Sequence, residues 1–192
     1  MNPVVRHPLL PILILLGLSA VTHADEPKTP RQAPHVHGIA HLTLAVEGPE
    51  VLVELTSPAA SLIGFEHAPL TEAERETLAL AKANLEAGDA MIRFSTLAAC
   101  RLETAEIEVD LPEIGQDHDH GHDHGHEDAH HADVHVSYRF TCDRPDALSS
   151  AALGLFAGFP ALERVLVQYV IPEGQGGAEL TPRQAVVNFV PF

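Results

Sequence analysis

The sequence predicts an α+β protein, predominantly antiparallel β, with two similar β/α halves joined by a disordered His-rich loop. Alternating apolar and polar residues predict many short strands, and few segments show helical periodicity. Residues 37–46 (HGIAHLTLAV) also align with residues 131–140 (HADVHVSYRF), and each segment precedes a predicted helix and two strands. A chance resemblance between two strands is the alternative to an internal repeat.

The N-terminal residues 1–24 are typical of a secretory signal peptide. Arg6 precedes an apolar run from Leu9 to Leu18, and Thr22–Ala24 provides a small-residue cleavage site. The apolar run is too short to span a bilayer, so we expect no membrane insertion after signal removal, although a short membrane anchor is an alternative. The chain is therefore predicted to be a soluble exported protein. Residues 25–34 contain three prolines and are expected to form an extended leader.

The first β/α half is predicted over residues 35–111. A turn at Gly48–Pro49 separates two alternating segments and predicts a hairpin. Thr71 and Glu74 form a capping box, so a helix should begin there and end at Gly88. The expected strands are 36–46, 51–55, 90–94 and 100–109, with a loop over 57–69.

The second β/α half is predicted over residues 133–192, after a mobile loop spanning residues 112–132. Its expected elements are strands at 134–142, 162–171 and 178–189, the last interrupted at 181–182, and a helix at 147–156.

Cys100 and Cys142 are the two cysteines of the chain, and two cysteines in an exported protein usually pair. A disulfide would close a loop of about 43 residues and stabilise the fold by roughly 4 kcal/mol at most. If strands 100–109 and 133–142 pair antiparallel with Cys100 opposite Cys142, Val109 falls opposite Asp133. The segment between the strands then forms the tip of a disulfide-clamped hairpin.

That segment holds a tract, residues 117–131 (DHDHGHDHGHEDAHH), in which seven of fifteen residues are histidine and five are acidic. Imidazole is the commonest protein ligand for borderline transition metals, and the tract has no large apolar side chain to bury. A harmless low-complexity insertion is the alternative to a metal-binding segment. The candidate ligands are His118, His120, His122, His124, His126, His130 and His131.

A fixed metal site is predicted from His35, His37 and His67. In an extended chain His35 and His37 point to the same face, about 6.6 Å apart at the backbone, so both imidazoles can reach one ion. His67 lies in a Gly-Phe-Glu-His loop. Further candidate ligands are His41, Glu66 and His135, although His41 and His135 are also typical of surface or packing histidines on matching strands.

No catalytic residue is predicted, and we do not expect an enzyme. Residues 126–130 match the H-E-x-x-H pattern of zinc proteases, but that chemistry needs a buried amphipathic helix, which the polar flanks do not provide. The net charge of −16 disfavours nucleic acid and anionic membranes as partners, although it also serves solubility.

Several motifs together resemble the ZrgA-type periplasmic zinc-uptake proteins of Gram-negative bacteria. They are His35-Val-His37-Gly38, Ser57-Pro58-Ala-Ala leading to Gly64-Phe65-Glu66-His67, Cys100, and a His/Asp tract before a strand ending in Cys142. The resemblance implies a zinc-responsive periplasmic protein that binds zinc and assists its uptake, with a β-rich fold of two similar halves. It also implies ligands at His35, His37 and the histidines from His118 to His131.

The expected function is capture, buffering or delivery of Zn(II) through histidine ligands, with a periplasmic zinc-uptake system as the partner. Ni(II) and Cu(II) would compete for such sites in vitro because affinity rises along the transition series. A non-catalytic structural or interaction module that assists a transporter, with an incidental tract, is one alternative. A metallohydrolase with an open ligand position beside Glu127 or Glu66 is another.

Overall fold

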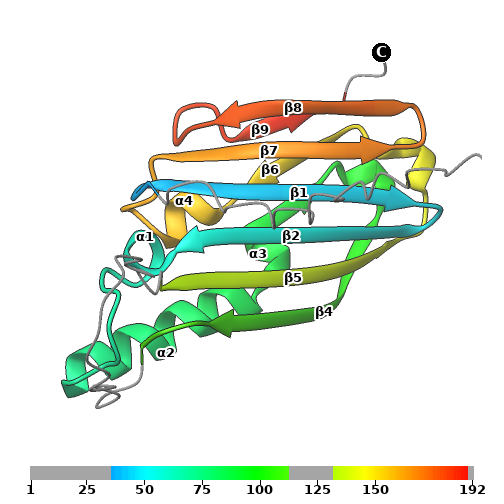
Figure 1. Ribbon diagram of the computed structural model, residues 1–192. Helices are drawn as coiled ribbons and strands as arrows, with labels where there is room; N and C mark the ends of the chain where they lie inside the picture. The colour runs from blue at the N-terminus through cyan, green and yellow to red at the C-terminus, as the bar shows by residue number, and fades with distance from the viewer. Residues whose placement is uncertain (1–35, 113–131, 190–192) are drawn as a thin grey trace, which may run out of the picture. The chain divides into compact units, whose positions relative to one another are not determined.

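A six-stranded sheet with the order β4-β5-β2-β1-β7-β8 dominates the computed structural model, which describes residues 36–112 and 132–189 (Figure 1). The β1–β7 pair is parallel and the other neighbouring pairs are antiparallel. The predicted α+β class with mainly antiparallel pairing is confirmed. The six strands are β1 (Ile39–Glu47), β2 (Glu50–Pro58), β4 (Cys100–Val109), β5 (Asp133–Cys142), β7 (Arg164–Ile171) and β8 (Gly174–Leu180).

A second layer lies behind this sheet in Figure 1 and contains a three-stranded sheet with the order β3-β6-β9. These strands are β3 (Ile92–Phe94), β6 (Ser150–Leu153) and β9 (Val186–Asn188). The helices are α1 (Ala59–Leu62), α2 (Glu72–Glu86), α3 (Gly88–Met91) and α4 (Leu155–Gly158), with 3-10 turns at Thr96–Ala98 and Pro145–Ala147. Within the described ranges, no helix combines the length and apolar character needed to cross a bilayer.

The two layers meet over one apolar face of the six-stranded sheet. Leu42 and Leu44 of β1 are buried in that core, whereas His41 and Thr43 between them are exposed on the opposite face. Tyr138 of β5 joins the layers, because its hydroxyl donates to the Leu85 carbonyl of α2 at 2.7 Å. The opposite face carries no described helix or strand and is available for polar side chains.

The predicted hairpin and the predicted helix are both confirmed. Glu47 pairs with Glu50 around Gly48, whose φ of +56° is a conformation that glycine adopts without steric cost. Helix α2 begins after Thr71 with the expected capping box, and Gly88 follows two residues after its last residue.

The predicted disulfide between Cys100 and Cys142 is confirmed, and the two residues face each other across β4 and β5. The predicted register at the other end of this strand pair is wrong by one residue, since Val109 lies opposite Val134 rather than Asp133. The ladder shifts between Leu102 and Thr104, where a bulge places one extra residue in β4.

The helix predicted over 147–156 is wrong. Its centre forms β6, which pairs with β3 on one side and β9 on the other, and helix α4 starts at Leu155. Small apolar residues are compatible with a helix or a strand, and here pairing with the two flanking strands stabilises the strand. Gly154 directly follows this strand, and its backbone lies so close to α3 that a Cβ would collide with the Ala90 carbonyl oxygen.

The predicted halves do not form separate sheets. β5, which follows the histidine tract, lies between β4 and β2 of the first half, and β7 pairs with β1. Both halves therefore complete one sheet within Ala33–Phe192, and an origin by repetition stays a prediction. The predicted signal peptide, the leader, His35 and the tract lie outside the described residues.

Candidate metal centre

The described segments that carry or adjoin the predicted ligands lie at one end of the six-stranded sheet. β1 and β5 begin there, and β2 and β4 end there (Figure 1). Asp110 N–H donates to the Asp133 carbonyl at 2.8 Å and holds the ends of β4 and β5 together. The described residues nearest the tract, Pro112 and Ala132, therefore emerge from this same end.

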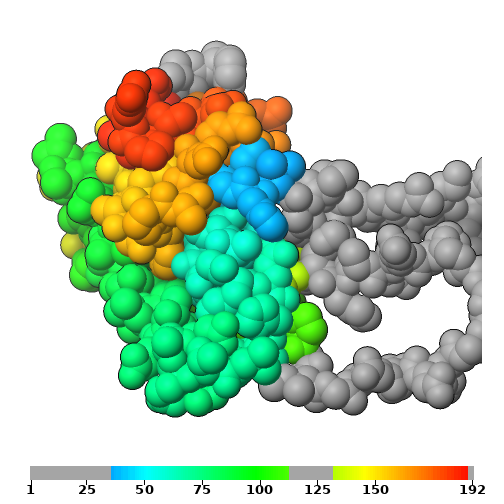
Figure 2. All heavy atoms as spheres, turned by 90° about the vertical axis from the view of Figure 1, so that its left-hand side faces the viewer, coloured from blue at the N-terminus to red at the C-terminus, as the bar shows by residue number. Residues whose placement is uncertain are grey.

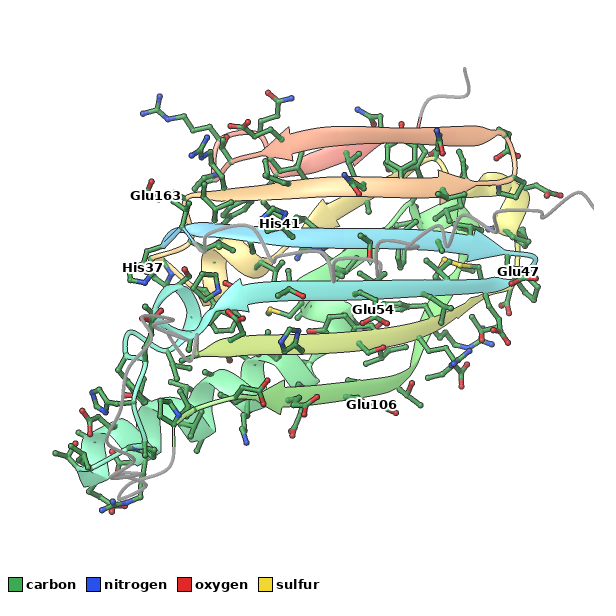
Figure 3. All side chains as sticks on the ribbon, viewed as in Figure 1. His37, His41, Glu47, Glu54, Glu106 and Glu163 are labelled. Atoms are coloured by element: carbon green, nitrogen blue, oxygen red, sulfur yellow. A yellow bond between two sulfur atoms is a disulfide. The ribbon has the colours of Figure 1, made fainter. Side chains whose placement is uncertain are left out.

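The start of β1 is fixed by a turn at Gly38, whose φ is +80°. Its N–H donates to the buried Ser61 hydroxyl at 2.9 Å, and its carbonyl accepts from Glu163 N–H at 2.8 Å. Figure 3 shows His37 and Glu163 at this end of the sheet. The backbone that carries His37 is therefore tied to both α1 and the segment leading into β7.

His37 contacts the Gly-Phe-Glu-His loop directly. Its Nε2 lies 2.9 Å from Oε1 of Glu66, at hydrogen-bond distance. An ionised carboxylate only accepts, so Nε2 carries the hydrogen and Nδ1 retains its lone pair. Metal-binding histidines commonly have a carboxylate partner of this kind on the second ring nitrogen. Glu66, predicted as a further ligand, is here the hydrogen-bond partner of a candidate ligand.

His67 has the opposite tautomer. Its Nδ1 lies 2.9 Å from the Ala68 carbonyl oxygen, which can only accept, so Nδ1 carries the hydrogen and Nε2 has the lone pair. The ring stacks on Phe65 with centroids 5.2 Å apart. Nε2 faces Oε1 of Glu74 at 3.7 Å, so a second imidazole and a second carboxylate lie together.

Sequence reasoning assigned Glu74 to the helix cap alone. Its Oε2 accepts from the Leu70 N–H at 2.8 Å and from the Thr71 N–H at 2.9 Å. These bonds, first that from Thr71, lower the pKa of the Glu74 carboxyl below its ordinary value. The capping-box spacing by itself explains why a glutamate stands at position 74. That spacing does not reveal that the second carboxylate oxygen faces His67.

His41 and His135 lie on the open face of the sheet, away from these two pairs. Both are cross-strand neighbours of Thr56, on β1 and β5 respectively, so their backbones are about 10 Å apart. His135 Nδ1 lies 3.3 Å from the Thr56 hydroxyl, and its Nε2 lies 3.8 Å from Asp110 Oδ2. The two histidines that align in the sequence thus flank one threonine.

Carboxylates extend from these histidines across the open face. Glu54 of β2 and Glu106 of β4 flank Ser137 of β5, whose hydroxyl donates to Glu54 Oε1 at 2.9 Å. Glu108 follows next to His135, and these residues line a hollow of about 330 Å³. Figure 3 shows Glu54 and Glu106 on neighbouring parts of this face. Their charge attracts cations toward the sheet.

The described residues contain pairs of potential ligands rather than a complete metal cage. Within residues 36–112 and 132–189, no three His, Cys, Asp or Glu side chains are grouped closely enough to hold an ion. Cys100 and Cys142 form the disulfide and are not ligands. His35 and the tract histidines belong to the part of the chain outside these ranges, so the predicted trio of His35, His37 and His67 stays a prediction.

An α+β protein with imidazole–carboxylate pairs at one sheet end has a donor set suited to divalent transition metals. The chain matches the family model for the ZrgA family zinc uptake protein over residues 34–189 and therefore belongs to that family. No curated protein matches the chain. The family resemblance expected from the motifs is confirmed, and with it a zinc-related role.

Proposed function

We propose that this protein binds Zn(II) in the periplasm and captures, buffers or delivers it for uptake through histidine ligands. The observation that carries the proposal is the position of His37 and His67 in a protein of a zinc-uptake family. Both lie in segments at the end of the sheet from which Pro112 and Ala132 lead into the tract. Figure 2 looks onto this end, where the start of β1 and the green-blue segment between β2 and α2 share one surface.

The ligand chemistry suits Zn(II). His37 presents a lone pair on Nδ1 and His67 on Nε2, because each ring donates its other N–H to an oxygen. Neutral imidazoles with one or two carboxylates form ordinary tetrahedral zinc sites. The same nitrogens would accept Ni(II) or Cu(II) in vitro, since ligand type alone does not exclude them.

Two affinity classes follow from the proposal. The loop and the start of β1 are held by hydrogen bonds in the described fold, so little ordering is needed there on binding. The tract composition predicts a segment that must lose conformational entropy to bind an ion, which weakens each of its sites. We therefore assign buffering to His118–His131 and tighter capture to His35, His37 and His67.

Export is the remaining part of the proposal. Residues 1–24 have the pattern of a cleaved signal peptide, and the Cys100–Cys142 disulfide suits a compartment that oxidises thiols. A periplasmic zinc-uptake system is the partner that this location and the family description favour.

The test is a chelator-competition titration of the mature chain with Zn(II) at neutral pH. Asparagine at all seven tract histidines should lower the zinc stoichiometry and leave at least one tighter site. In that variant, H37N with H67N should abolish the tighter site, whereas H41N with H135N, which also removes two imidazoles, should retain it. A wild-type chain that retains no zinc would refute the function, and a tract variant without any site would refute the fixed site.

One observation favours the alternative of an interaction module. The open sheet face has a hollow of about 760 Å³ lined in part by Leu52 and Val170, which are 37% and 55% exposed. These residues align through Ala45 in one row across β2, β1 and β7. If docking of this face to a transporter is the whole function, asparagine at every tract histidine will leave zinc-limited growth unchanged, whereas L52E with V170E will impair it.

A further inference from the structure

We infer that Glu74 is a metal ligand that acts together with His67, so that a bound divalent cation joins the Gly-Phe-Glu-His loop to the first turn of α2. This inference rests on the proposed zinc binding and adds a ligand that lies outside the predicted set. It gives the capping-box glutamate two functions, one for each carboxylate oxygen.

The separation of the two atoms fits a shared ion better than a direct bond. His67 Nε2 and Glu74 Oε1 are 3.7 Å apart, which exceeds the 2.7–3.2 Å of an N–H···O hydrogen bond. Two ligand atoms of a tetrahedral zinc, each about 2.0–2.1 Å from the metal, are roughly 3.3 Å apart. A small side-chain movement would therefore bring both atoms to the distances of one coordination sphere.

Both groups are oriented by contacts on their far sides. The His67 ring is held by the Nδ1 hydrogen bond to Ala68 and by stacking on Phe65, which directs Nε2 toward Glu74. The carboxylate is held through Oε2 by two backbone N–H groups, which leaves Oε1 toward His67. Such contacts on the non-ligating atoms are the usual means of orienting metal ligands.

The other imidazole–carboxylate pair shows the difference between a carboxylate that orients a histidine and one that is placed to bind the metal itself. His37 and Glu66 are 2.9 Å apart and already form a hydrogen bond, so Glu66 fixes the tautomer of His37. Glu74 and His67 are 3.7 Å apart, beyond hydrogen-bond distance, and in the neutral ring the Ala68 carbonyl places the hydrogen on Nδ1. In the neutral ring, Nε2 and Oε1 therefore face each other as two lone-pair donors, an arrangement that is stabilised either by a proton on Nε2 or by a shared metal cation.

The charge around the helix start permits a cation there. The helix dipole is positive at its N-terminus and opposes a bound cation, but Glu72 and Glu74 lie in the first turn of α2. Glu72 is bonded to Arg75 at 2.9 Å, so the Glu74 carboxylate is the group whose charge faces His67. Glu72 therefore provides a neighbouring carboxylate for a matched control.

The experiment uses E74Q in the full mature chain with asparagine at the seven tract histidines, so that tract binding does not mask the fixed site. Glutamine also serves in a capping box, so the helix cap and the apo unfolding midpoint should be preserved. Zinc affinity measured by chelator competition should fall at least about tenfold, a loss typical of damage to a metal site. E72Q should change the affinity less than twofold.

A second measurement separates ligation from helix stability. T71A removes the hydroxyl that accepts from the Glu74 N–H, so it should lower the apo unfolding midpoint while zinc still shifts the NMR signals of the His67 ring and the Glu74 carboxyl carbon. E74Q with unchanged affinity, or equal losses in E74Q and E72Q, would overturn the role of Glu74. Absence of zinc binding in the parent chain would instead overturn the proposed function on which this inference rests.

Discussion

At the scale of single residues, the tautomer of each imidazole decides which nitrogen can meet a metal. Glu66 makes Nδ1 the free nitrogen of His37, and the Ala68 carbonyl makes Nε2 the free nitrogen of His67. Sequence reasoning selected both histidines from their motifs but could not assign these roles. The partner of His37 is 29 residues away, and the partner of His67 is the carbonyl of the next residue, which the identity of that residue does not reveal.

Acid should release zinc from the protein. Protonated imidazole cannot ligate, so the affinity should fall as the pH drops below the ordinary histidine pKa of about 6.5. The backbone hydrogen bonds of the helix cap lower the pKa of Glu74 in the folded protein below its ordinary value. The carboxylate therefore stays ionised between pH 7.5 and pH 5, and the stability that the cap contributes is lost only at lower pH, as the pH falls through the folded-state pKa. Competition titrations at these two pH values, with circular dichroism as the folding control, check the prediction. Equal affinity at both would contradict histidine ligation.

At the scale of elements, features that depend on neighbouring residues were predicted correctly, whereas features that depend on pairing with distant strands were not. The capping box of α2 and the glycine turn between β1 and β2 each depend on a few neighbouring residues, and both were predicted. Strand β6 was predicted as helix because its state depends on pairing with β3 and β9, which come from distant parts of the chain. The bulge in β4 was missed for a similar reason, because counting residues from Cys100 assumes an unbroken ladder.

The β4–β5 pair should depend strongly on its disulfide. Replacing Cys100 and Cys142 together by serine should lower the free energy of unfolding by up to about 4 kcal/mol, because the closed loop restricts the unfolded chain. Urea unfolding of wild type and variant measures this. The wild type with a reducing agent should behave like the variant, whereas the variant should not respond to the reducing agent. A variant as stable as the oxidised wild type would show that the crosslink contributes nothing.

At the scale of the whole described fold, one sheet face builds the core and the other remains open to polar groups. This division follows from the alternating pattern, because its period of two places successive side chains on opposite faces. The pattern could not predict the order of the strands, in which β5 lies between two strands of the first half. The family match over residues 34–189 agrees with the motif-based prediction, whereas Glu74 became a candidate ligand from the structure alone.

The contact between the two layers should be sensitive to loss of one oxygen. Tyr138 is fully buried, its hydroxyl donates to the Leu85 carbonyl, and burial raises the pKa of the phenol. Y138F should lower the free energy of unfolding by about 1 kcal/mol, since it leaves a buried carbonyl without this donor. Urea unfolding of the wild type and the variant checks this value. A Y138F variant at least as stable as wild type would contradict it.

The crosslinked cysteines lie at the opposite end of the six-stranded sheet from the imidazole–carboxylate pairs. Cys100 begins β4 and Cys142 ends β5, while Asp110 and Asp133 mark the end near the tract, roughly 30 Å away along the strands. The disulfide is thereby separated from the proposed zinc ligands by most of the length of the sheet. If histidines carry the proposed zinc binding, the ion can be bound and released without any thiolate ligand, so its affinity should not depend on the redox state of the surroundings.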